Sequence, residues 1–77
     1  MSCLLTELPR GRKGIVRRIT AGRVATQRLA DMGITVGTTI KVKESAPFSG
    51  PICVFVRGST LAIGRGLASK IVVEEIS

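Results

Sequence analysis

The stretch RVATQRLADMGITVGT, residues 23–38, decides the fold because it predicts a helix, the end of that helix and a turn into a strand. Apolar side chains recur at positions i, i+4 and i+7, which lines one face of a short helix with Ala25, Leu29 and Met32. Gly33 follows where a helix commonly ends on a left-handed residue, and Ile34 can then fold back onto Leu29 in a Schellman motif. We therefore expect the helix to end at Gly33.

The chain turns again directly after this helix. Val36-Gly37 predicts a type II turn in which Gly37 takes a positive φ. Residues 38–44 then alternate, with Ile40 and Val42 on one face of a strand and lysines on the other. A helix with one apolar face that turns straight into a strand is expected to lie across a small sheet.

Four other segments predict strands because they are rich in β-branched residues: 14–20, 52–57, 60–63 and 70–76. The first of them has imperfect alternation around Arg17 and Arg18, which predicts a bulge and places these two side chains on opposite faces. A tight turn at Gly58-Ser59 joins two strands into a hairpin. Residues 64–69 can form one helical turn that buries Leu67 or Ala68, and the apolar residues of 1–8 are expected to pack against the side of the sheet. The pattern predicts one mainly β domain over residues 1–77: a small five-stranded barrel, open in part or closed, with one helix after the first strand.

The charge is strongly basic. The 77 residues carry twelve Lys and Arg against five Asp and Glu, a formal net charge of +7. Seven of the twelve lie between Glu7 and Asp31 with no acidic residue among them: Arg10, Arg12, Lys13, Arg17, Arg18, Arg23 and Arg28. Such a segment favours an acidic protein, a nucleic acid or an anionic membrane surface, or is simply a solvated face.

Catalytic and metal-binding residues are scarce in this sequence. It contains no histidine, and the acidic residues show no spacing that would bring two carboxylates together for acid–base catalysis. Cys3 and Cys53 lie far apart and belong to no CxxC motif, so we expect free thiols in a reducing cytoplasm. These residues predict a protein that is not an enzyme and holds no cofactor or metal. Neither a secretory signal nor an apolar run long enough to insert into a membrane is evident.

The chain has the positive charge that nucleic-acid binding requires but lacks a surface on which bases can stack. Small barrels that bind single strands stack bases on aromatic side chains, and Phe48 and Phe55 are the two aromatic residues of the chain. What remains is electrostatic affinity without sequence preference. A nucleic-acid-associated or transcription-regulatory module therefore stays open as the alternative function.

Four short motifs, in this order along the chain, resemble the FeoA family of small accessory proteins of bacterial ferrous iron uptake. They are Leu5, Leu8, Pro9 and Gly11; RLADMGITVGTTIKV over residues 28–42; Ala46-Pro47 with Gly50-Pro51; and residues 61–65 followed by Ala68 and Ile71. Val36 stands where a proline is common in the family, and Ser49 replaces a glycine. The resemblance implies an SH3-like barrel. A similar domain also ends some iron-dependent repressors, so fold likeness does not settle the role.

The resemblance further implies a cytoplasmic protein that acts by contact with the GTPase portion of the membrane transporter FeoB. The family carries an association with transition-metal ions, but this chain lacks the ligands of an iron carrier. We expect a monomer or weak homo-oligomer whose outward arginines form one basic patch. The residues expected to contact an acidic partner are Arg18, Arg23 and Arg28, with Phe48 as an apolar contact.

Overall fold

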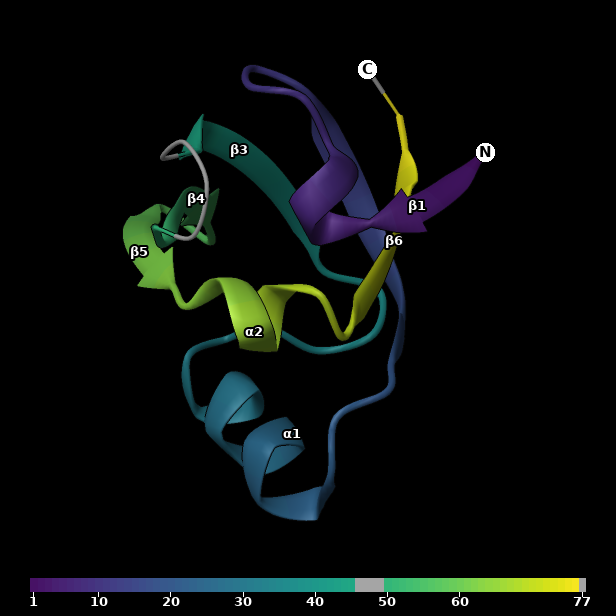
Figure 1. Ribbon diagram of the computed structural model, residues 1–77, viewed down its shortest axis with the longest axis vertical. Helices are drawn as coiled ribbons and strands as arrows, with labels where there is room; N and C mark the ends of the chain where they lie inside the picture. Colours follow the sequence, from purple (N-terminus) through teal and green to yellow (C-terminus); the bar gives the residue numbers. More distant parts are fainter. Residues whose placement is uncertain (46–49, 77) are drawn as a thin grey trace.

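The computed structural model describes residues 1–45 and 50–76 of the chain, and within them the protein is a single antiparallel sheet carrying two short α-helices (Figure 1). In chain order the elements are β1 (Ser2–Leu4), the 3-10 helix η1 (Leu5–Glu7), β2 (Lys13–Ile19), α1 (Arg23–Asp31), β3 (Thr39–Ser45), β4 (Ile52–Val56), β5 (Ser59–Ile63), α2 (Arg65–Ala68) and β6 (Ile71–Glu75). Figure 1 shows α1 at one end of the molecule, while β1 begins and β6 ends at the opposite end. No helix in the described ranges is long and apolar enough to cross a membrane.

The sheet corrects two expectations about the fold class. It has six strands rather than five, in the order β1-β6-β2-β3-β4-β5, because residues 2–4 pair with β6 instead of merely packing on the side. No pairing among the described residues joins β1 to β5, so the sheet is open and not a closed barrel. A second helix, α2, also accompanies the one expected after the first strand; it is the single helical turn predicted for residues 64–69 and it buries Ala68.

The end of α1 is confirmed as a Schellman motif. Gly33 has φ +89°, the amide of Ile34 donates to the carbonyl of Leu29 at 2.8 Å, and the amide of Gly33 donates to the carbonyl of Ala30 at 2.9 Å. Leu29 and Ile34 are both fully buried. These two bonds satisfy carbonyls that a helix end would otherwise leave unpaired, and the apolar contact fixes the direction in which the chain leaves the helix.

The following turn is fixed onto β2. Gly37 has φ +95°, and the amide of Thr38 donates to the carbonyl of Thr35 at 3.0 Å, as predicted for a type II turn. Gly37 and Thr38 also exchange backbone hydrogen bonds of 2.7 and 2.8 Å with Val16. The turn therefore delivers the chain into β3 in register with β2.

The core lies on the inner face of the sheet, under α1, α2 and η1. Its buried members include the alternate residues predicted to face inward on β3 and β4. The complete set is Leu5, Leu8, Val16, Leu29, Ile34, Ile40, Val42, Ile52, Val54, Val56, Ile63, Ala68, Ile71 and Val73. These side chains remove the inward-facing apolar surface of the strands from water, which is the main stabilising contribution in a domain this small.

The bulge predicted in the first strand is confirmed. The register of β2 against β6 shifts between Val16 and Arg18, so Arg17 is an extra residue in the ladder. Arg17 and Arg18 are both exposed, in agreement with the expectation that at most one of them could face inward and that its charge would still reach water. The added residue resets the alternation, so Val16 points into the core while both arginines remain in water.

The β4–β5 hairpin is joined to the end of α1 by one arginine. Arg57 and Gly58 both have positive φ, +49° and +84°, as in the type I′ turns that suit hairpins. The guanidinium of Arg57 donates to the carbonyl of Gly33 at 3.1 Å and to the hydroxyl of Thr38 at 3.4 Å. Because Thr38 is buried, these bonds tie two distant turns together at the edge of the core.

Candidate functional site

A groove of about 300 Å³ between α1 and β2 contains one of the residues expected to bind a partner, Arg18. We call it the helix groove. Its lining comes from three consecutive elements, namely Arg17, Arg18 and Ile19 of β2, Thr26 and Ala30 of α1, and Ile34, Thr35 and Val36 of the turn before β3. Each of these elements is positioned by the Schellman motif and the type II turn described above.

The helix groove combines apolar surface with positive charge. Ile34 is buried and Ile19 half-buried, whereas Val36 is 64% exposed at the turn. An exposed branched residue on a turn that two hydrogen bonds hold in place offers an apolar contact at little conformational cost. With Arg18 beside it, the groove is suited to a partner that presents an apolar side chain next to a carboxylate.

The two neighbouring arginines of β2 differ in their availability to such a partner. Arg17 donates from Nε to Glu74 Oε1 at 2.7 Å, and Arg12 pairs with Glu75 at 3.4 Å. These are the ion pairs found within residues 1–45 and 50–76, and Arg18 takes part in neither. Arg18 is therefore the cation of the helix groove whose charge no described carboxylate offsets.

The helix places Arg23 and Arg28 on different flanks. Arg23 precedes Thr26 and Ala30 by three and seven residues, so it lies on the flank of α1 that borders the helix groove. Arg28 is five residues beyond Arg23 and therefore lies about 140° around the helix, on the flank of the exposed Val24. Of the three arginines, Arg18 lines the helix groove, Arg23 lies outside the lining on the neighbouring flank of α1, and Arg28 lies on the other flank.

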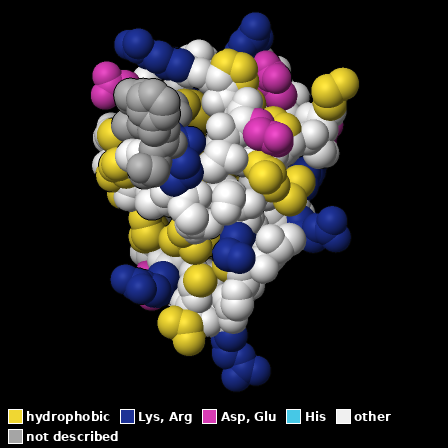
Figure 2. Space-filling view, viewed as in Figure 1, with side chains coloured by type: hydrophobic (Ala, Val, Ile, Leu, Met, Phe, Trp, Pro, Cys, Tyr) yellow, Lys and Arg dark blue, Asp and Glu magenta, His cyan; other side chains and the backbone are white. Residues whose placement is uncertain are grey.

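The basic residues on the face drawn in Figure 2 are spread out rather than gathered in one place. Figure 2 shows Lys and Arg side chains projecting at several separate points around the face drawn, with acidic side chains among them near one end. Arg12 and Arg17, two of the seven basic residues between Glu7 and Asp31, are also paired with Glu75 and Glu74 and so contribute less net positive charge. Phe48, expected as an apolar contact, lies outside the described residues.

Val24 and Val36 are the exposed apolar residues around α1 that the sequence reasoning did not select. The exposure of Val24 could be predicted from the sequence, because Val24 directly precedes Ala25 and therefore lies outside the apolar face of the predicted helix. For Val36 the position in a predicted turn already indicated exposure. Of these two exposed residues, Val36 lines the helix groove, whereas Val24 lies on the flank of Arg28.

The cysteine and carboxylate groups are not arranged as a reactive or metal-binding cluster in the part of the chain that the structure describes. Burial raises the pKa of the Cys3 thiol, and the charges of Glu7 and Glu75 raise it further against a smaller opposing effect of the N-terminal ammonium. A raised pKa keeps the thiol protonated at neutral pH, which disfavours both nucleophilic attack and metal ligation. The helix groove itself is lined by arginine, threonine and apolar side chains, which offer a partner charge, hydrogen-bonding and apolar contacts.

Comparison with known proteins gives a family match and two close relatives in sequence. The model of the FeoA domain matches residues 3–75. A candidate Fe(2+) transport protein A of Methanocaldococcus jannaschii is 48% identical over 65 residues, which are 84% of this chain and 77% of that protein. A fusion of Fe(2+) transport protein A with the Fe(2+) transporter FeoB, from Porphyromonas gingivalis, is 33% identical over 73 residues, covering 95% of this chain and 9% of the fusion.

Solved structures support the same fold. The crystal structure of an iron uptake regulatory protein, FeoA, is 46% identical, with a TM-score of 0.92 over 99% of this chain and 100% of that one. The FeoA of Stenotrophomonas maltophilia, described as an SH3 domain protein, has a TM-score of 0.80 over 94% of this chain and 89% of that one at 24% identity, which indicates an SH3-like fold. A manganese-dependent transcriptional repressor has a TM-score of 0.89 at 26% identity, covering 97% of this chain and 42% of the repressor.

Proposed function

Because the chain belongs to the FeoA family, we propose that this ferrous iron transport accessory acts in the cytoplasm by contacting the GTPase portion of a FeoB-type transporter. The observation that carries this proposal is the fusion relative, in which one polypeptide contains both the FeoA-like and the FeoB parts. Fusion holds two modules at a high effective concentration, so two parts that act together gain from being joined. Separate chains then need an interface of their own.

The helix groove is the surface proposed for this contact. Arg18 and the exposed Val36 line it, and Arg23 stands on the flank of α1 next to it. Arg28 contributes to the docking of an acidic partner from the other flank of α1, and therefore more weakly. Exposed charges of this kind raise the rate of encounter more than they strengthen the final complex.

Charge reversal tests the helix groove directly. The double variant Arg18→Glu and Arg23→Glu is expected to slow association with the soluble domain of the cognate transporter by roughly 3- to 10-fold at low salt, and to flatten the salt dependence. The measurement is the association rate on an immobilised transporter domain at two salt concentrations. Folding is not expected to suffer, because Arg23 stands in the first turn of α1, where a carboxylate interacts better with the helix dipole than a cation does.

Arg28→Glu serves as the matched control, with the same charge change on the same helix but on the opposite flank. We expect it to slow association less than Arg23→Glu alone. Equal rates for wild type and the double variant at low salt would reduce these arginines to a solubility feature. Equal slowing by Arg23→Glu and Arg28→Glu would favour general attraction by net charge over a specific groove.

A role by protein contact also predicts that the purified protein does not retain ferrous iron tightly. The chain has no histidine, Glu74 and Glu75 each pair with an arginine, and the Cys3 thiol has a raised pKa. Anaerobic titration is expected to show no stoichiometric site with a Kd below about 1 μM. Saturable binding at one iron per chain with a lower Kd would contradict this prediction and favour an iron-carrying role.

A regulatory module of transcription is the second candidate function, and the likeness to the manganese-dependent repressor favours it. The chain corresponds to less than half of that repressor, so the comparison concerns one part of it. Under this alternative the protein would bind nucleic acid with sequence preference, and the preference would persist at physiological salt. Retention that disappears with salt and ignores sequence would leave the transporter contact as the better explanation.

A further inference from the structure

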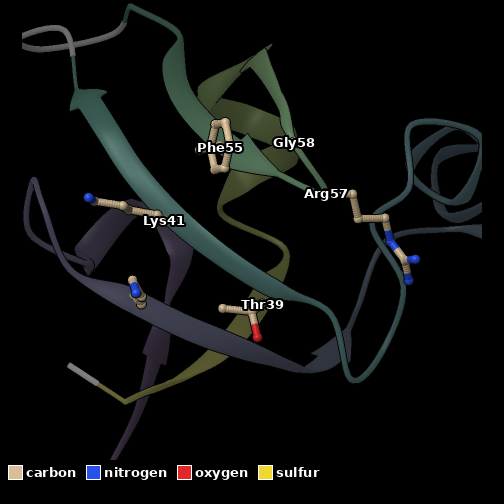
Figure 3. Close-up of a pocket in the computed structure, with 6 residues that line it drawn as sticks. Thr39, Lys41, Phe55, Arg57 and Gly58 are labelled. Atoms are coloured by element: carbon tan, nitrogen blue, oxygen red, sulfur yellow. The ribbon is translucent and has the colours of Figure 1, made fainter.

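A second groove, of about 450 Å³, lies over β2, β3 and β4 on the side of the sheet away from the core (Figure 3). Its lining residues are Lys13, Thr39, Lys41, Phe55, Arg57 and Gly58. The strand register places Lys13 directly opposite Lys41, and Lys41 directly opposite Phe55, so these three form one row across the sheet. Lys43 of β3 reaches back over the Phe55 ring, with its Nζ 5.8 Å from the ring centroid. We call Lys13, Lys41, Lys43 and Phe55 the lysine face.

No ion pair described within residues 1–45 and 50–76 involves a lysine of the lysine face, and Glu74, which faces Ile15 on the same side of the sheet, is paired with Arg17. Two like charges directly opposite each other on neighbouring strands are destabilising, and Lys13 and Lys41 stand in that relation. No acidic residue is among the six that line the groove. Glu44 is the acidic residue of the same strand, and its register partner is Cys53, beyond the Phe55 row. The two described ion pairs involve Arg12 and Arg17 instead.

The apolar part of the groove is the exposed ring of Phe55, which is 41% accessible to water. Figure 3 shows Lys41 on β3 and Phe55 on the neighbouring β4, with the guanidinium of Arg57 turned away from them. That guanidinium is bound to Gly33 and Thr38, so Arg57 contributes its aliphatic stem to the groove and not its charge. The lysine face therefore combines three ammonium groups with one partly covered aromatic ring.

We propose that the lysine face is a docking site for an acidic, extended segment of a partner protein. Carboxylates of the segment pair with the ammonium groups of Lys13, Lys41 and Lys43, and an apolar side chain between them packs on the free edge of Phe55. Charge complementarity selects this occupant, because it relieves the Lys13–Lys41 repulsion that the protein alone leaves unbalanced. The inference goes beyond the proposed function, since it concerns a second surface and holds whichever protein carries the segment.

The geometry around Phe55 favours a peptide over a single-stranded nucleic acid. β-Sheets that bind single-stranded DNA or RNA stack successive bases on the faces of several aromatic rings. Phe55 is the aromatic residue of the described ranges, and Lys43 already lies over its ring. A base would have to displace that ammonium group, whereas a carboxylate can pair with it in place. The compact ammonium groups of lysine, rather than the forked guanidinium, also suit separate carboxylates along a chain.

A synthetic peptide tests the proposal with the intact protein. The probe is an acetylated, amidated peptide with four glutamates on each side of one tryptophan, and the protein itself contains no tryptophan or tyrosine to interfere with its fluorescence. Controls are the same peptide with glutamines and an octamer of single-stranded oligothymidine. The variants are Lys13→Gln with Lys41→Gln, Phe55→Thr, and Lys70→Gln as an exposed lysine away from this groove. Binding is measured at roughly 20 mM and roughly 200 mM salt.

We expect saturable binding of the glutamate peptide that is weakened about fivefold or more in the double lysine variant and reduced in Phe55→Thr, but changed less than about twofold in Lys70→Gln. The double lysine variant should melt at the wild-type temperature or above it, because a like-charge pair is removed. Equal loss in Lys70→Gln, or no loss in the double lysine variant, would overturn the proposal. Tighter binding of the oligothymidine, sensitive to the same lysines, would replace the peptide by a nucleic acid as occupant.

Discussion

Gly33→Val is expected to lower the free energy of unfolding by about 2–4 kcal/mol, a large fraction of the stability of a domain this small. Gly33 has φ +89°, a conformation that L-residues adopt at a cost of about 1–2 kcal/mol and that a β-branched residue resists more strongly. A Cβ at this position would also lie 3.2 Å from Cδ of Arg57. Thermal unfolding followed by circular dichroism measures the effect, and the expected fall in Tm is roughly 10–20 °C.

The steric part of this cost has a structural consequence. Arg57 Nε donates to the carbonyl of Gly33 itself, so a side chain at Gly33 disturbs the bond that ties the β4–β5 hairpin to the end of α1. The Schellman bonds to Ala30 and Leu29 leave little freedom for the backbone to turn away. The strain therefore spreads to two turns rather than staying local.

Substitutions at two other glycines separate the cost of the positive φ from the cost of the contact with Arg57. Gly37 has φ +95°, but nothing lies within 4 Å of an added Cβ, so Gly37→Val carries the backbone cost without the Arg57 contact. Gly22 precedes α1 at φ −66° with open space around it, so Gly22→Ala should change stability by less than about 0.5 kcal/mol. Gly33→Val should therefore lower the free energy of unfolding more than Gly37→Val does. A Gly33→Val protein that melts like the wild type would show that the left-handed helix end is not required.

The sequence predicted those parts of the fold that depend on neighbouring residues. The glycine that ends α1, the type II turn at Gly37 and the β4–β5 hairpin are set by a few consecutive residues with special backbone demands. The bulge in β2 was visible because alternation failed around Arg17. In each case a few neighbouring residues favour one backbone conformation, and the tertiary structure is compatible with that conformation.

The parts that the sequence did not predict depend on distant partners. The three residues of β1 pair with β6 from the other end of the chain, and so short a segment has no pattern to identify it. Whether a sheet closes depends on the stagger between its first and last strands, which composition does not encode. Arg57 is similar, because its sequence position indicates a solvated charge while its hydrogen bonds reach Gly33 and Thr38.

The partner-binding role of Arg18, Arg23, Arg28 and Phe48 stays a prediction, and the structure shows only where the first three lie. Arg18 lies in the helix groove, and Arg23 lies on the flank that borders it. The separation of Arg28 could have been seen beforehand, because two residues five apart on a helix do not share a face. The lysine face required the register, since Lys13 and Phe55 become neighbours of Lys41 only once three strands are aligned.

Leu29→Ala is expected to be the second severe change, lowering the free energy of unfolding by about 2–5 kcal/mol. Leu29 is fully buried, accepts the Schellman bond from Ile34 and packs in the core on which α1 rests. Truncation removes apolar contacts and leaves a cavity that the rigid turn after the helix cannot close. Urea unfolding should show a lower midpoint, with a slope close to that of the wild type because the fold itself is retained.

Val24→Ala is the control for Leu29→Ala, since it truncates an apolar residue of the same helix that is 73% exposed. Its effect on the free energy of unfolding should stay within about 0.5 kcal/mol, because alanine also favours the helix. The ratio of the two effects measures how much α1 depends on packing rather than on its own helical propensity. If the two variants lost similar stability, Leu29 would not anchor the helix to the sheet. The helix groove, whose α1 side consists of Thr26 and Ala30, would then lack a fixed wall, and partner binding by Arg18 and Arg23 would have to order the helix first.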